Sequence, residues 1–541
     1  MNKFLLNTLI FSFSICGSIY SYSQDNFKAK DAGSINATLD SSNLPIVRIN
    51  TNGQSIPDEP KITADMFIID HGYNIINHAS DTAYTYKGKI GIEMRGSISQ
   101  SGFWPQKSYG IETRTKSGLD TNIVLMDMPK ESDWVLYGPY DDHALMRNVL
   151  TYKLVSQMGY WAPRTKYCEL QLNTLLSYNY KGVYVMMEKI KRDNNRVDIS
   201  KLDNDDNAGD SLTGGYIFAV DKNINKPDSG WTSHHPQNTG VFYTYKYPSG
   251  DDITPQQKLY IKAYVDSFEN AMSGPGFENP VTGFRKYIEP MSFIDFFFIQ
   301  ELSKNIDAYK RSAYLYKDKN SKGGKLHAGP HWDYNSAYGI AFCGFDSDTG
   351  WTYPLTCWIN QSFQVPFWWK KLLQDTSYTH DLKCRWLHLR STVLDTVNIF
   401  HNMDSIAKYI SLASTRQFAQ YNINTTLQAD VNVLKTWFRK RLKWMDAHMP
   451  GNCWNIDIND ESLEKYFSIY PNPSSGKFNV QSLIFKINRI EIYDTFGRNI
   501  QSLYADDKAA TIDISNYPAG VYFMKCYSDA GTLSRKIVKV E

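Results

Sequence analysis

The chain lacks long runs of charge of one sign. Its 541 residues carry 58 basic and 56 acidic side chains, and the formal net charge is only +2. Proteins that bind nucleic acid or an anionic membrane surface usually gather basic residues in a patch or stripe, and this balance indicates neither. We therefore expect no nucleic-acid partner and infer partners from individual sites.

Long hydrophobic segments are also missing beyond the N-terminus. Residues 1–24 hold one lysine, an apolar run that starts at Phe4, and then small and polar residues, a pattern typical of a secretory signal peptide. Lipidation of Cys16 is disfavoured because the bulky Ile15 precedes it. No later segment approaches about 18 uninterrupted apolar residues, so we expect no transmembrane segment in the mature chain.

Cysteine is scarce, and its spacing matches no zinc motif. Six of the seven cysteines follow the predicted signal peptide, without a CxxC pair or a Cys/His pattern. In an oxidising compartment Cys343 and Cys357, which bracket a loop rich in Gly and Asp, could form a disulfide, although six cysteines allow fifteen connectivities. Buried free thiols are the alternative.

The hydrophobic content of 42% is enough for two or more domain cores at this length. Alternating apolar and polar residues predict an antiparallel sheet in the first half, with one inserted helix over residues 138–159. Residues 221–253 are interpreted as a polar loop. Helices are predicted from Thr254 to about Met272, from about Ser292 towards Asp307, and through most of residues 366–449. The predicted boundaries are a linker at 25–42, a body at 43–450 and a second linker at 451–466.

Residues 467–541 differ from the body. Short alternating strands separated by Pro, Asn and Gly turns predict a small β-sandwich. The ordered motifs are YPNP at 470–473, IYDTFGR at 492–498, IDIS at 512–515 and YPAGVYF at 517–523. This tail resembles the C-terminal sorting domain of type IX secretion. The resemblance implies the type IX secretion machinery of a Gram-negative bacterium as a partner, and a protein that is secreted or attached to the outer-membrane surface.

The most informative stretch of the body runs from Asn305 to Gly339. Asp307 follows an apolar helix, and Asp333 follows a predicted β-hairpin that returns the chain beside its start. Two such carboxylates suit phosphoryl transfer, one near the acceptor hydroxyl and one on Mg²⁺. They also suit the acid and base of a glycosidase. A purely structural alternative makes Asp307 a helix cap and places Asp333 in an Asx-turn.

Several separated motifs resemble the CotH family, the spore coat protein H-like secreted atypical protein kinases. They cover residues 44 to about 450 and are IEMRGS at 92–97, PQKSYGIETR at 105–114, MRNVLTYKL at 146–154, YKGVYVMMEKI at 180–190, SKNIDAYKRSAYLYKD at 303–318 and GPHWDYNSAYG at 329–339. The resemblance implies an α+β, atypical protein-kinase-like fold of two lobes, β-rich then α-rich. It also implies transfer of the γ-phosphate of ATP to Ser or Thr of a protein substrate, for which a serine-rich protein is a candidate.

The resemblance also implies roles for single residues. Asp307 would orient or deprotonate the acceptor hydroxyl, and Asp333 would bind Mg²⁺ or Mn²⁺. The family commonly has a second Asp in the last motif, where this chain has Asn335, which can ligate a metal with less charge. Five residues after Asp307, where ordinary protein kinases place a metal-binding Asn, this chain has Ser312.

Four further residues are candidates for nucleotide binding. Lys107, on a predicted strand, could reach the phosphates of a nucleotide, or it could be a solvated lysine at the sheet edge. Arg95 could bind the same phosphates, or it could pack over the sheet and pair with a surface acid. Arg147, beside Asn148 on the inserted helix, could brace the cleft or form an exposed i,i+4 pair. Glu188 lies in a strand that resembles the segment that joins the two lobes, where adenine would stack. The alternative is that Glu188 forms a salt bridge at a strand end.

Three residues near these candidates are predicted to be structural, namely Lys317, Asp318 and His331. Our leading hypothesis is a secreted CotH-like Ser/Thr kinase that uses ATP and Mg²⁺. The alternative is a cell-surface binding or adhesion protein that kept the kinase fold and lost transfer, which Asn335 and Ser312 favour. A carbohydrate-active enzyme is disfavoured, since no Trp platform is interleaved with a further acidic pair.

Overall fold

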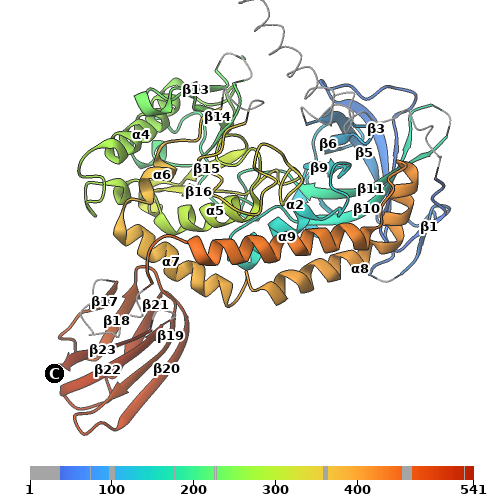
Figure 1. Ribbon diagram of the computed structural model, residues 1–541. Coiled ribbons are helices and arrows are strands. Elements are labelled where there is room, and N and C mark those ends of the chain that lie inside the picture. Colours follow the sequence, from blue (N-terminus) through green and yellow to red (C-terminus); the bar gives the residue numbers. More distant parts are fainter. Residues whose placement is uncertain are drawn as a thin grey trace, which may run out of the picture. The chain divides into compact units, whose positions relative to one another are not determined.

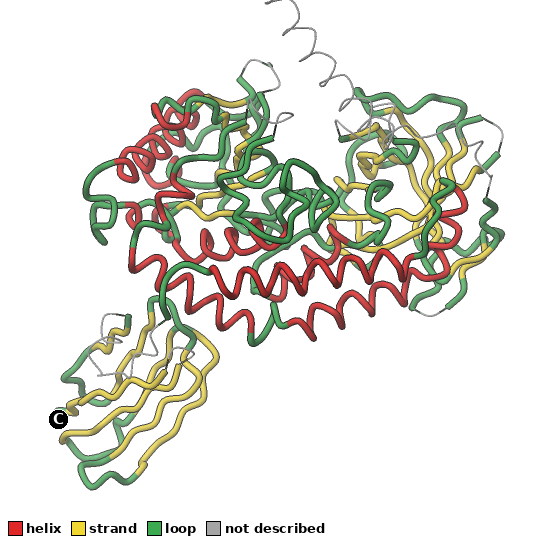
Figure 2. The backbone as a smooth tube through the Cα atoms, in the orientation of Figure 1, coloured by secondary structure: helices red, strands yellow, loops and turns green. Residues whose placement is uncertain are grey.

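The computed structural model describes residues 37–73, 75–96, 104–175, 177–223, 226, 228–357, 363–453, 466–528 and 531–541. The predicted signal peptide and most of the two predicted linkers lie outside these residues. The chain divides into two compact units, which meet between Gly451 and Asn452 in sequence. The first unit mixes helices and strands, whereas the described part of the second contains strands and no helix (Figures 1 and 2).

Seven strands of the first unit form a closed barrel. Their order around the barrel is β10-β11-β9-β6-β5-β3-β2. Neighbours pair antiparallel except β10 and β2, whose parallel pairing closes the barrel. The strands are β2 Ile46–Asn50, β3 Ile62–Ile69, β5 Tyr86–Arg95, β6 Ser108–Arg114, β9 Asp133–Tyr137, β10 Thr165–Asn173 and β11 Asn179–Glu188. The predicted sheet is therefore present, and its closure is a feature that local patterns did not predict.

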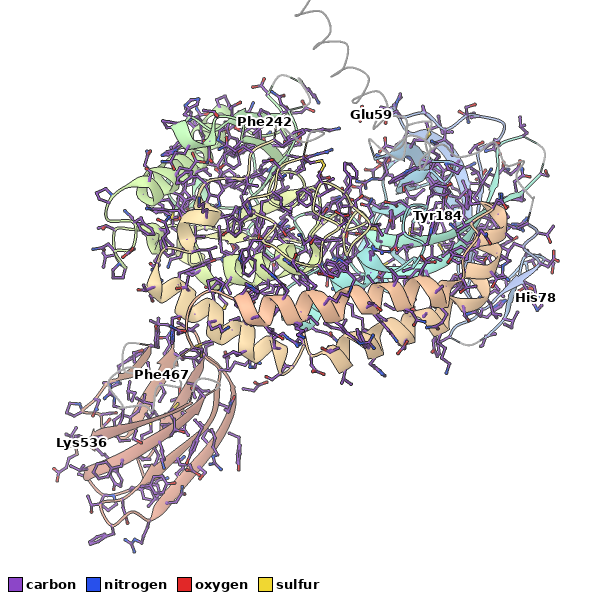
Figure 3. All side chains as sticks on the ribbon, viewed as in Figure 1. Glu59, His78, Tyr184, Phe242, Phe467 and Lys536 are labelled. Carbon is purple, nitrogen blue, oxygen red and sulfur yellow. A yellow bond between two sulfur atoms is a disulfide. The ribbon has the colours of Figure 1, made fainter. Side chains whose placement is uncertain are left out.

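The barrel interior is filled by alternate residues of each strand. Ile90 and Ile92 of β5, for example, are fully buried in this core. Tyr184 of β11 also belongs to it (Figure 3), and its hydroxyl donates a hydrogen bond to the carbonyl oxygen of Lys107 at 2.9 Å. Val183 and Val185 face the other way and pack in the main core of the unit. Because the second half of β11 is buried on both faces, residues 183–187 of this strand are all apolar.

A second sheet has the order β13-β14-β12-β15-β16. Its strands are β12 Tyr216–Val220, β13 Gly230–Thr232, β14 Phe242–Tyr247, β15 Ala313–Lys317 and β16 Leu326–Ala328. The predicted hairpin is confirmed as β15 and β16. The interpretation of residues 221–253 as a loop is wrong, since β13 and β14 lie there. Trp231 stacks on Tyr243 at 4.8 Å between ring centroids, so aromatic packing stabilises strands whose flanking residues are those of turns.

The helices surround this second sheet and extend to the barrel. They are α2 Arg147–Gln157, α3 Gly209–Leu212, α4 Pro255–Ser273, α5 Pro290–Ser303, α6 Trp368–Leu372, α7 Thr376–Arg390, α8 Thr396–Gln420 and α9 Leu427–His448. The predicted start of α4 is confirmed by a capping box between Thr254 and Gln257. The inserted helix begins at Arg147 instead of residue 138, because the preceding residues form turns.

The long helices α8 and α9 lie along both halves of the first unit (Figure 1). Helix α8 packs against β11 of the barrel, and α9 packs against α5. Buried amides connect α8 to the barrel, since Gln417 accepts from the Val183 amide at 2.8 Å and donates to Gln106 at 3.0 Å. The barrel and the second sheet therefore share one helical support.

A buried ion pair joins α5 to α9. The side chains of Glu301 and Arg441 are fully buried, with Nη2 and Oε2 3.4 Å apart. Arg441 also donates to the Glu301 carbonyl oxygen at 2.9 Å and to that of Gly350 at 2.7 Å. The Glu301 carboxylate accepts from the Thr352 amide at 2.6 Å and the Tyr353 amide at 3.1 Å. The pair thus fixes the loop around residues 350–353 to both helices.

The second unit is all β. One sheet contains β17 Phe467–Tyr470, β18 Lys477–Ser482 and β21 Ala509–Asp513, and the other contains β19 Ile487–Tyr493, β20 Asn499–Asp507, β22 Gly520–Ser528 and β23 Gly531–Lys539. Both sheets contribute to one core, with Phe478 and Ile512 from the first and Ile490 and Met524 from the second. Two sheets around a common core match the β-sandwich that the alternation predicted.

We expect Arg441→Met to lower the free energy of unfolding of the first unit by about 3–5 kcal/mol, because it leaves the Glu301 carboxylate buried without its counter-charge. Urea unfolding of the full chain, followed by tryptophan fluorescence, measures this, since residues 466–541 contain no Trp. Lys440→Met is the control; Lys440 is exposed and lies 3.7 Å from Asp348. It should change stability by less than about 1 kcal/mol. Equal effects of the two variants would contradict this role of the pair.

Candidate functional site

Asp307 lies in a turn after α5. The helix ends at Ser303, and Lys304 takes a left-handed conformation that redirects the chain. The Asp307 amide donates to the side-chain oxygen of Asn305 at 3.2 Å, and its carboxylate lies 3.3 Å from Nη1 of Arg311. Its side chain is only 17% exposed. The turn therefore presents a partly buried carboxylate beside a fixed guanidinium.

Asp333 follows β16 and is held through its backbone. Its φ is +68°, a left-handed conformation that Asp tolerates better than most residues. The Asp333 amide donates to the Tyr152 hydroxyl at 3.3 Å, and its carbonyl oxygen accepts from Nδ2 of Asn305 at 2.6 Å. Asn305 thus contacts both segments and holds the Asp307 turn next to Asp333.

The charge of Asp333 is held in an unfavourable environment. Burial and then the negative charge of Asp307 raise the pKa of Asp333 to about 7, although Arg95 and Arg311 act in the opposite direction. Asp307, after α5, and Asp333, after β16, are therefore close enough for their charges to interact. Such a pair is relieved by a cation or a proton.

One face of α2 holds the segment that follows Asp333. Arg147 donates through Nε to the Ala337 carbonyl oxygen at 3.0 Å, and Asn148 accepts from the Tyr334 amide at 2.6 Å. The Thr151 and Tyr338 hydroxyls are 2.6 Å apart. Tyr152 accepts the hydrogen bond from the Asp333 amide. We call Arg147, Asn148, Thr151 and Tyr152 the α2 clamp. Their i, i+1, i+4 and i+5 spacing places them on one side of the helix.

Arg147 is buried and does not form the exposed i,i+4 pair that was one alternative. Its guanidinium forms an ion pair with the buried Asp142, whose carboxylate also accepts from the Arg147 amide at 2.7 Å. These partners and Ala337 account for its position behind the segment at 333–338. Its place suits positioning of that segment more than direct contact with a nucleotide.

Asn335 and Asp141 meet beside this segment. Nδ2 of Asn335 donates to Oδ2 of Asp141 at 3.0 Å. Oδ1 of Asp141 is buried and has no hydrogen-bond partner among the described residues. Burial raises the pKa of Asp141 to about 6, and the hydrogen bond from Asn335 opposes that rise. Sequence reasoning missed Asp141, although the acidic pair at 141–142 directly before a helix was a visible signal.

Arg95 ends β5 and faces the same region. Its guanidinium carbon lies 5.7 Å from the ring centroid of Trp332, the residue before Asp333. Its positive charge acts on Asp333, Tyr314 and Lys189. A cavity of about 220 Å³ in the barrel is lined by Arg95, Lys189 and acidic residues that include Glu93 and Asp133. The structure therefore brings Arg95 into electrostatic range of Asp333.

Lys107 and Glu188 lie in the barrel. Lys107 immediately precedes β6 instead of lying within it, and burial lowers its pKa. Glu188 is fully buried at the end of β11, where Oε1 lies 2.7 Å from Nη1 of Arg164 and 3.6 Å from Nε of Arg196. Glu188 therefore has the strand-end salt bridge that was its alternative interpretation.

The three residues that were predicted to be structural have structural partners. His331 is buried, its Nδ1 lies 2.7 Å from the Tyr334 hydroxyl, and burial lowers its pKa to about 3. Asp318 accepts from the Ser200 amide at 3.0 Å, and Lys317 donates to the Thr213 carbonyl oxygen.

Of the two alternatives for Cys343 and Cys357, a disulfide and free thiols, the structure has the disulfide. Its loop packs on Ile306, the neighbour of Asp307, through Phe345 and Cys357. Lys310 reaches the loop by donating to the Leu355 carbonyl oxygen at 3.2 Å. Cys384 and Cys453 are also disulfide-bonded, whereas Cys168 and Cys526 are buried free thiols. The cross-linked loop thus supports the turn that carries Asp307.

The donor set fits a Mg²⁺ ion of the type that also binds phosphates. The described residues contain no group of three or more His, Cys, Asp and Glu side chains placed to hold a metal. Mg²⁺ in nucleotide sites, however, takes only one or two carboxylates and completes its shell with phosphates and water. The mutual repulsion of Asp333 and Asp307 and the buried, unsatisfied oxygen of Asp141 are consistent with such an ion.

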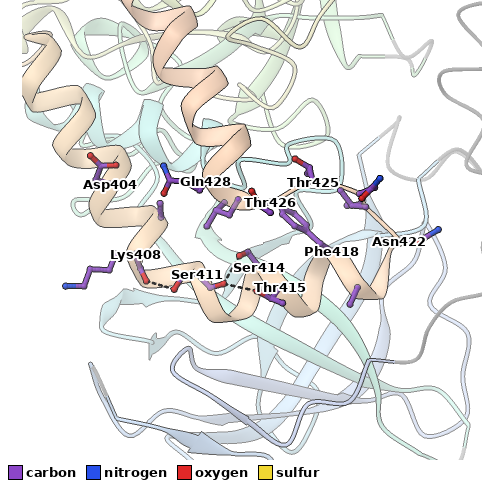
Figure 4. A pocket seen from close by; sticks show the side chains of 15 residues that line it. Asp404, Lys408, Ser411, Ser414, Thr415, Phe418, Asn422, Thr425, Thr426 and Gln428 are labelled. Atoms are coloured by element: carbon purple, nitrogen blue, oxygen red, sulfur yellow. Dashed lines mark hydrogen bonds between the residues drawn. The ribbon is translucent and has the colours of Figure 1, made fainter.

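A larger pocket lies elsewhere in the fold. It has a volume of about 830 Å³ and is lined by residues of α8, α9 and their connection, including Asp404, Lys408, Phe418 and Gln428 (Figure 4). None of the predicted site residues lines it. Its size therefore says nothing of the chemistry at Asp307 and Asp333.

Comparison with known proteins identifies the body. Residues 92–445 match the family described as CotH kinase protein. The chain belongs to the CotH kinase family. The match spans the CotH segments that contain Arg95, Lys107, Asp307 and Asp333, so the resemblance in the sequence is confirmed. No curated protein matches the chain.

The tail of this CotH protein is identified as well. Residues 468–540 match the family described as secretion system C-terminal sorting domain, which indicates type IX secretion to the cell surface or outside the cell. Among the residues that the structure describes, no helix is long and apolar enough to cross a membrane.

We expect Asp333→Asn to stabilise the metal-free protein. A carboxyl whose folded pKa is raised costs folding free energy as the pH rises from its unfolded value towards about 7. Discounting for partial solvent screening, the advantage of the variant over the parent should grow by about 1–2 kcal/mol between pH 5 and pH 8. Urea unfolding in EDTA at several pH values measures this.

Asp318→Asn is the matched control with the opposite sign. Burial of Asp318 is outweighed by hydrogen bonds from Ser200 and Lys319, which lower its pKa. This variant should therefore lose stability relative to the parent as the pH rises through the acidic range. The same pH trend in both variants would rule out charge repulsion at Asp333 as the cause.

Proposed function

We propose that this protein is a secreted CotH-type protein kinase that transfers the γ-phosphate of ATP to a Ser or Thr hydroxyl of a protein substrate. The observation that carries the proposal is the pair of mutually repelling carboxylates, Asp307 and Asp333, flanked by Arg95 and Arg311. An acidic pair between cations suits a reaction in which phosphate charge, a divalent cation and a hydroxyl proton must be balanced in one place.

Each residue has a distinct task in this proposal. Asp307 accepts the proton of the acceptor hydroxyl while the new oxygen–phosphorus bond forms and the bond from the γ-phosphorus to the bridging oxygen of ADP breaks. Asp333 holds Mg²⁺ or Mn²⁺, which when bound neutralises phosphate charge. Arg311 orients the Asp307 carboxylate, because its guanidinium lies 3.3 Å from that carboxylate.

The barrel and the helix-supported second sheet correspond, in this proposal, to the two lobes of a kinase-like domain at residues 43–450. Arg95 and Lys107 are the cationic residues that we propose for the phosphates. Glu188 and Arg147 are assigned supporting roles, since Arg164, Arg196 and Asp142 already pair with them. The nucleotide would lie near the ends of β5 and β6.

A binding or adhesion protein without transfer activity is the second candidate. Asn335 is the observation that favours it, because its amide carries no charge and its Nδ2 is engaged by Asp141. Ser312 replaces a further metal-binding residue of ordinary kinases. Both candidates share the same export by type IX secretion and differ only in whether nucleotide and metal are used.

We propose that a signal peptide at residues 1–24 starts export from a Gram-negative cell and that the domain at 467–541 directs outer-membrane passage. Because extracellular ATP is scarce, we propose that the kinase phosphorylates its substrate, for which a serine-rich protein is a candidate, during transit. The oxidising compartment fits the Cys343–Cys357 disulfide.

The test is transfer of label from γ-labelled ATP to a serine-rich peptide by the full mature chain with Mg²⁺ or Mn²⁺. Asp307→Asn should lower kcat by about 10²–10⁴-fold, as expected for loss of a general base, while nucleotide still raises the melting temperature. Asp333→Ala should abolish both the transfer and the metal-dependent thermal shift.

Asp404→Asn is the matched control, because Asp404 is an exposed carboxylate on α8 that pairs with Lys435. It should transfer label at the parental rate. No transfer by the parent with either metal, together with no thermal shift on adding nucleotide, would exclude the kinase and leave the binding protein.

A further inference from the structure

Asn335 leaves the proposed metal site short of one negative charge. An amide oxygen can ligate Mg²⁺, but affinity depends on the number of charged ligands and on the rigidity of the site. The structure places an unassigned carboxylate, Asp141, directly on Asn335, with Nδ2 and Oδ2 3.0 Å apart. The two residues are far apart in sequence, so this contact is a product of the fold.

The hydrogen bond also orients the amide. An ionised carboxylate can only accept, so the NH₂ group of Asn335 must face Asp141 and its carbonyl oxygen must face away. Asn335 Nδ2 also lies 3.2 Å from the Ser336 hydroxyl oxygen, which reinforces that orientation. The side-chain oxygen of Asn335, the atom of its amide that can bind a cation, therefore faces away from Asp141.

Asp141 keeps one oxygen without a partner. Oδ1 is buried, and no described residue hydrogen-bonds to it. A buried unsatisfied carboxylate oxygen is costly, and in native proteins such groups commonly mark an ion or another function. The adjacent Asp142 differs from Asp141, because both of its carboxylate oxygens have partners, namely the guanidinium and the backbone amide of Arg147.

Asp141 is also held in a fixed place relative to Asp333. Asp142 and Arg147 anchor the turn that contains it to α2, and the α2 clamp holds Asp333 and the residues after it. The negative charge of Asp141 acts on Asp333 in the metal-free protein. The same helix therefore positions both carboxylates.

We propose that Asp141 supplies the second carboxylate of the divalent-cation site, binding the cation through Oδ1 and replacing the charge that Asn335 lacks. The inference rests on the proposed function for the identity of the site, but it concerns cation binding and can be measured without phosphoryl transfer. It makes Asn335 a neutral spacer between Asp141 and the segment of Asp333.

The experiment measures the Kd of Mn²⁺ by electron paramagnetic resonance, with the full mature chain, alone and with a non-hydrolysable ATP analogue. Asp141→Asn should weaken Mn²⁺ binding by about tenfold or more, as expected for the loss of one charged ligand. Asp127→Asn is the control, because the Asp127 side chain is 90% exposed and its carboxylate lies 3.6 Å from Nζ of Lys166. It should leave Kd unchanged.

The charge-swapped double variant, Asp141→Asn with Asn335→Asp, decides the matter. It keeps one carboxylate and one amide in hydrogen-bonding contact. It should restore the Kd of Mn²⁺ to within about threefold of the parent, because the negative charge is displaced by no more than the length of one hydrogen bond. An unchanged Kd of Mn²⁺ in Asp141→Asn would overturn the proposal. A double variant that does not restore Kd would also overturn it, because Asp141 would then have a structural role.

The outcomes separate this inference from the proposed kinase activity. A parent that binds Mn²⁺ through Asp141 but transfers no label supports the inference and contradicts the kinase. A parent that transfers label while Asp141→Asn binds Mn²⁺ normally supports the kinase and contradicts the inference. A parent that binds no Mn²⁺ in either condition overturns the inference directly.

Discussion

The hydrogen bonds from α2 to residues 333–338 are the constraint on which the candidate site depends. Asp333 has a positive φ and a carboxylate that is repelled by Asp307, so its conformation is unfavourable both in backbone and in charge. Tyr152, Asn148 and Arg147 fix the backbone at Asp333 and at the residues that follow it. Without these contacts, the repulsion would be relieved by movement of the segment.

Two buried ion pairs support the α2 clamp and the helices around it. The Asp142–Arg147 pair sits at the start of α2, and the Glu301–Arg441 pair joins α5 to α9. Each guanidinium also donates to carbonyl oxygens of the loops that surround the site. Buried pairs of this kind add little net stability but specify one arrangement strongly, which suits a site that must hold like charges together.

The disulfide-bonded loop at residues 343–357 connects the secretion of the protein with its candidate site. Its disulfide can form only in an oxidising compartment, and the loop packs against Ile306, beside Asp307. The type IX sorting domain sends the chain to the cell surface or beyond, where the bond persists. The turn that carries the proposed general base is therefore supported by a cross-link that matches the destination of the protein.

Local sequence patterns were reliable where secondary structure and chemistry are encoded within a few residues. The capping box of α4, the apolar helix α5 and the β15–β16 hairpin follow from short-range spacing. Asp307 and Asp333 could be paired because a hairpin must return the chain to its start. The strands β13 and β14 were missed because they are short and lie among residues typical of turns, whereas the aromatic packing that stabilises them, such as Trp231 on Tyr243, is a tertiary contact.

The sequence by itself determined the family and the all-β sorting tail, and it singled out the two acidic residues of the candidate site, because these depend on ordered motifs and local periodicity. Only the tertiary structure decided the closure of the barrel, the burial of Arg147 and the contact between Asp141 and Asn335. Each of these requires segments far apart in the chain to meet. Such meetings are selected by the packing of the whole core, which no short window of sequence contains.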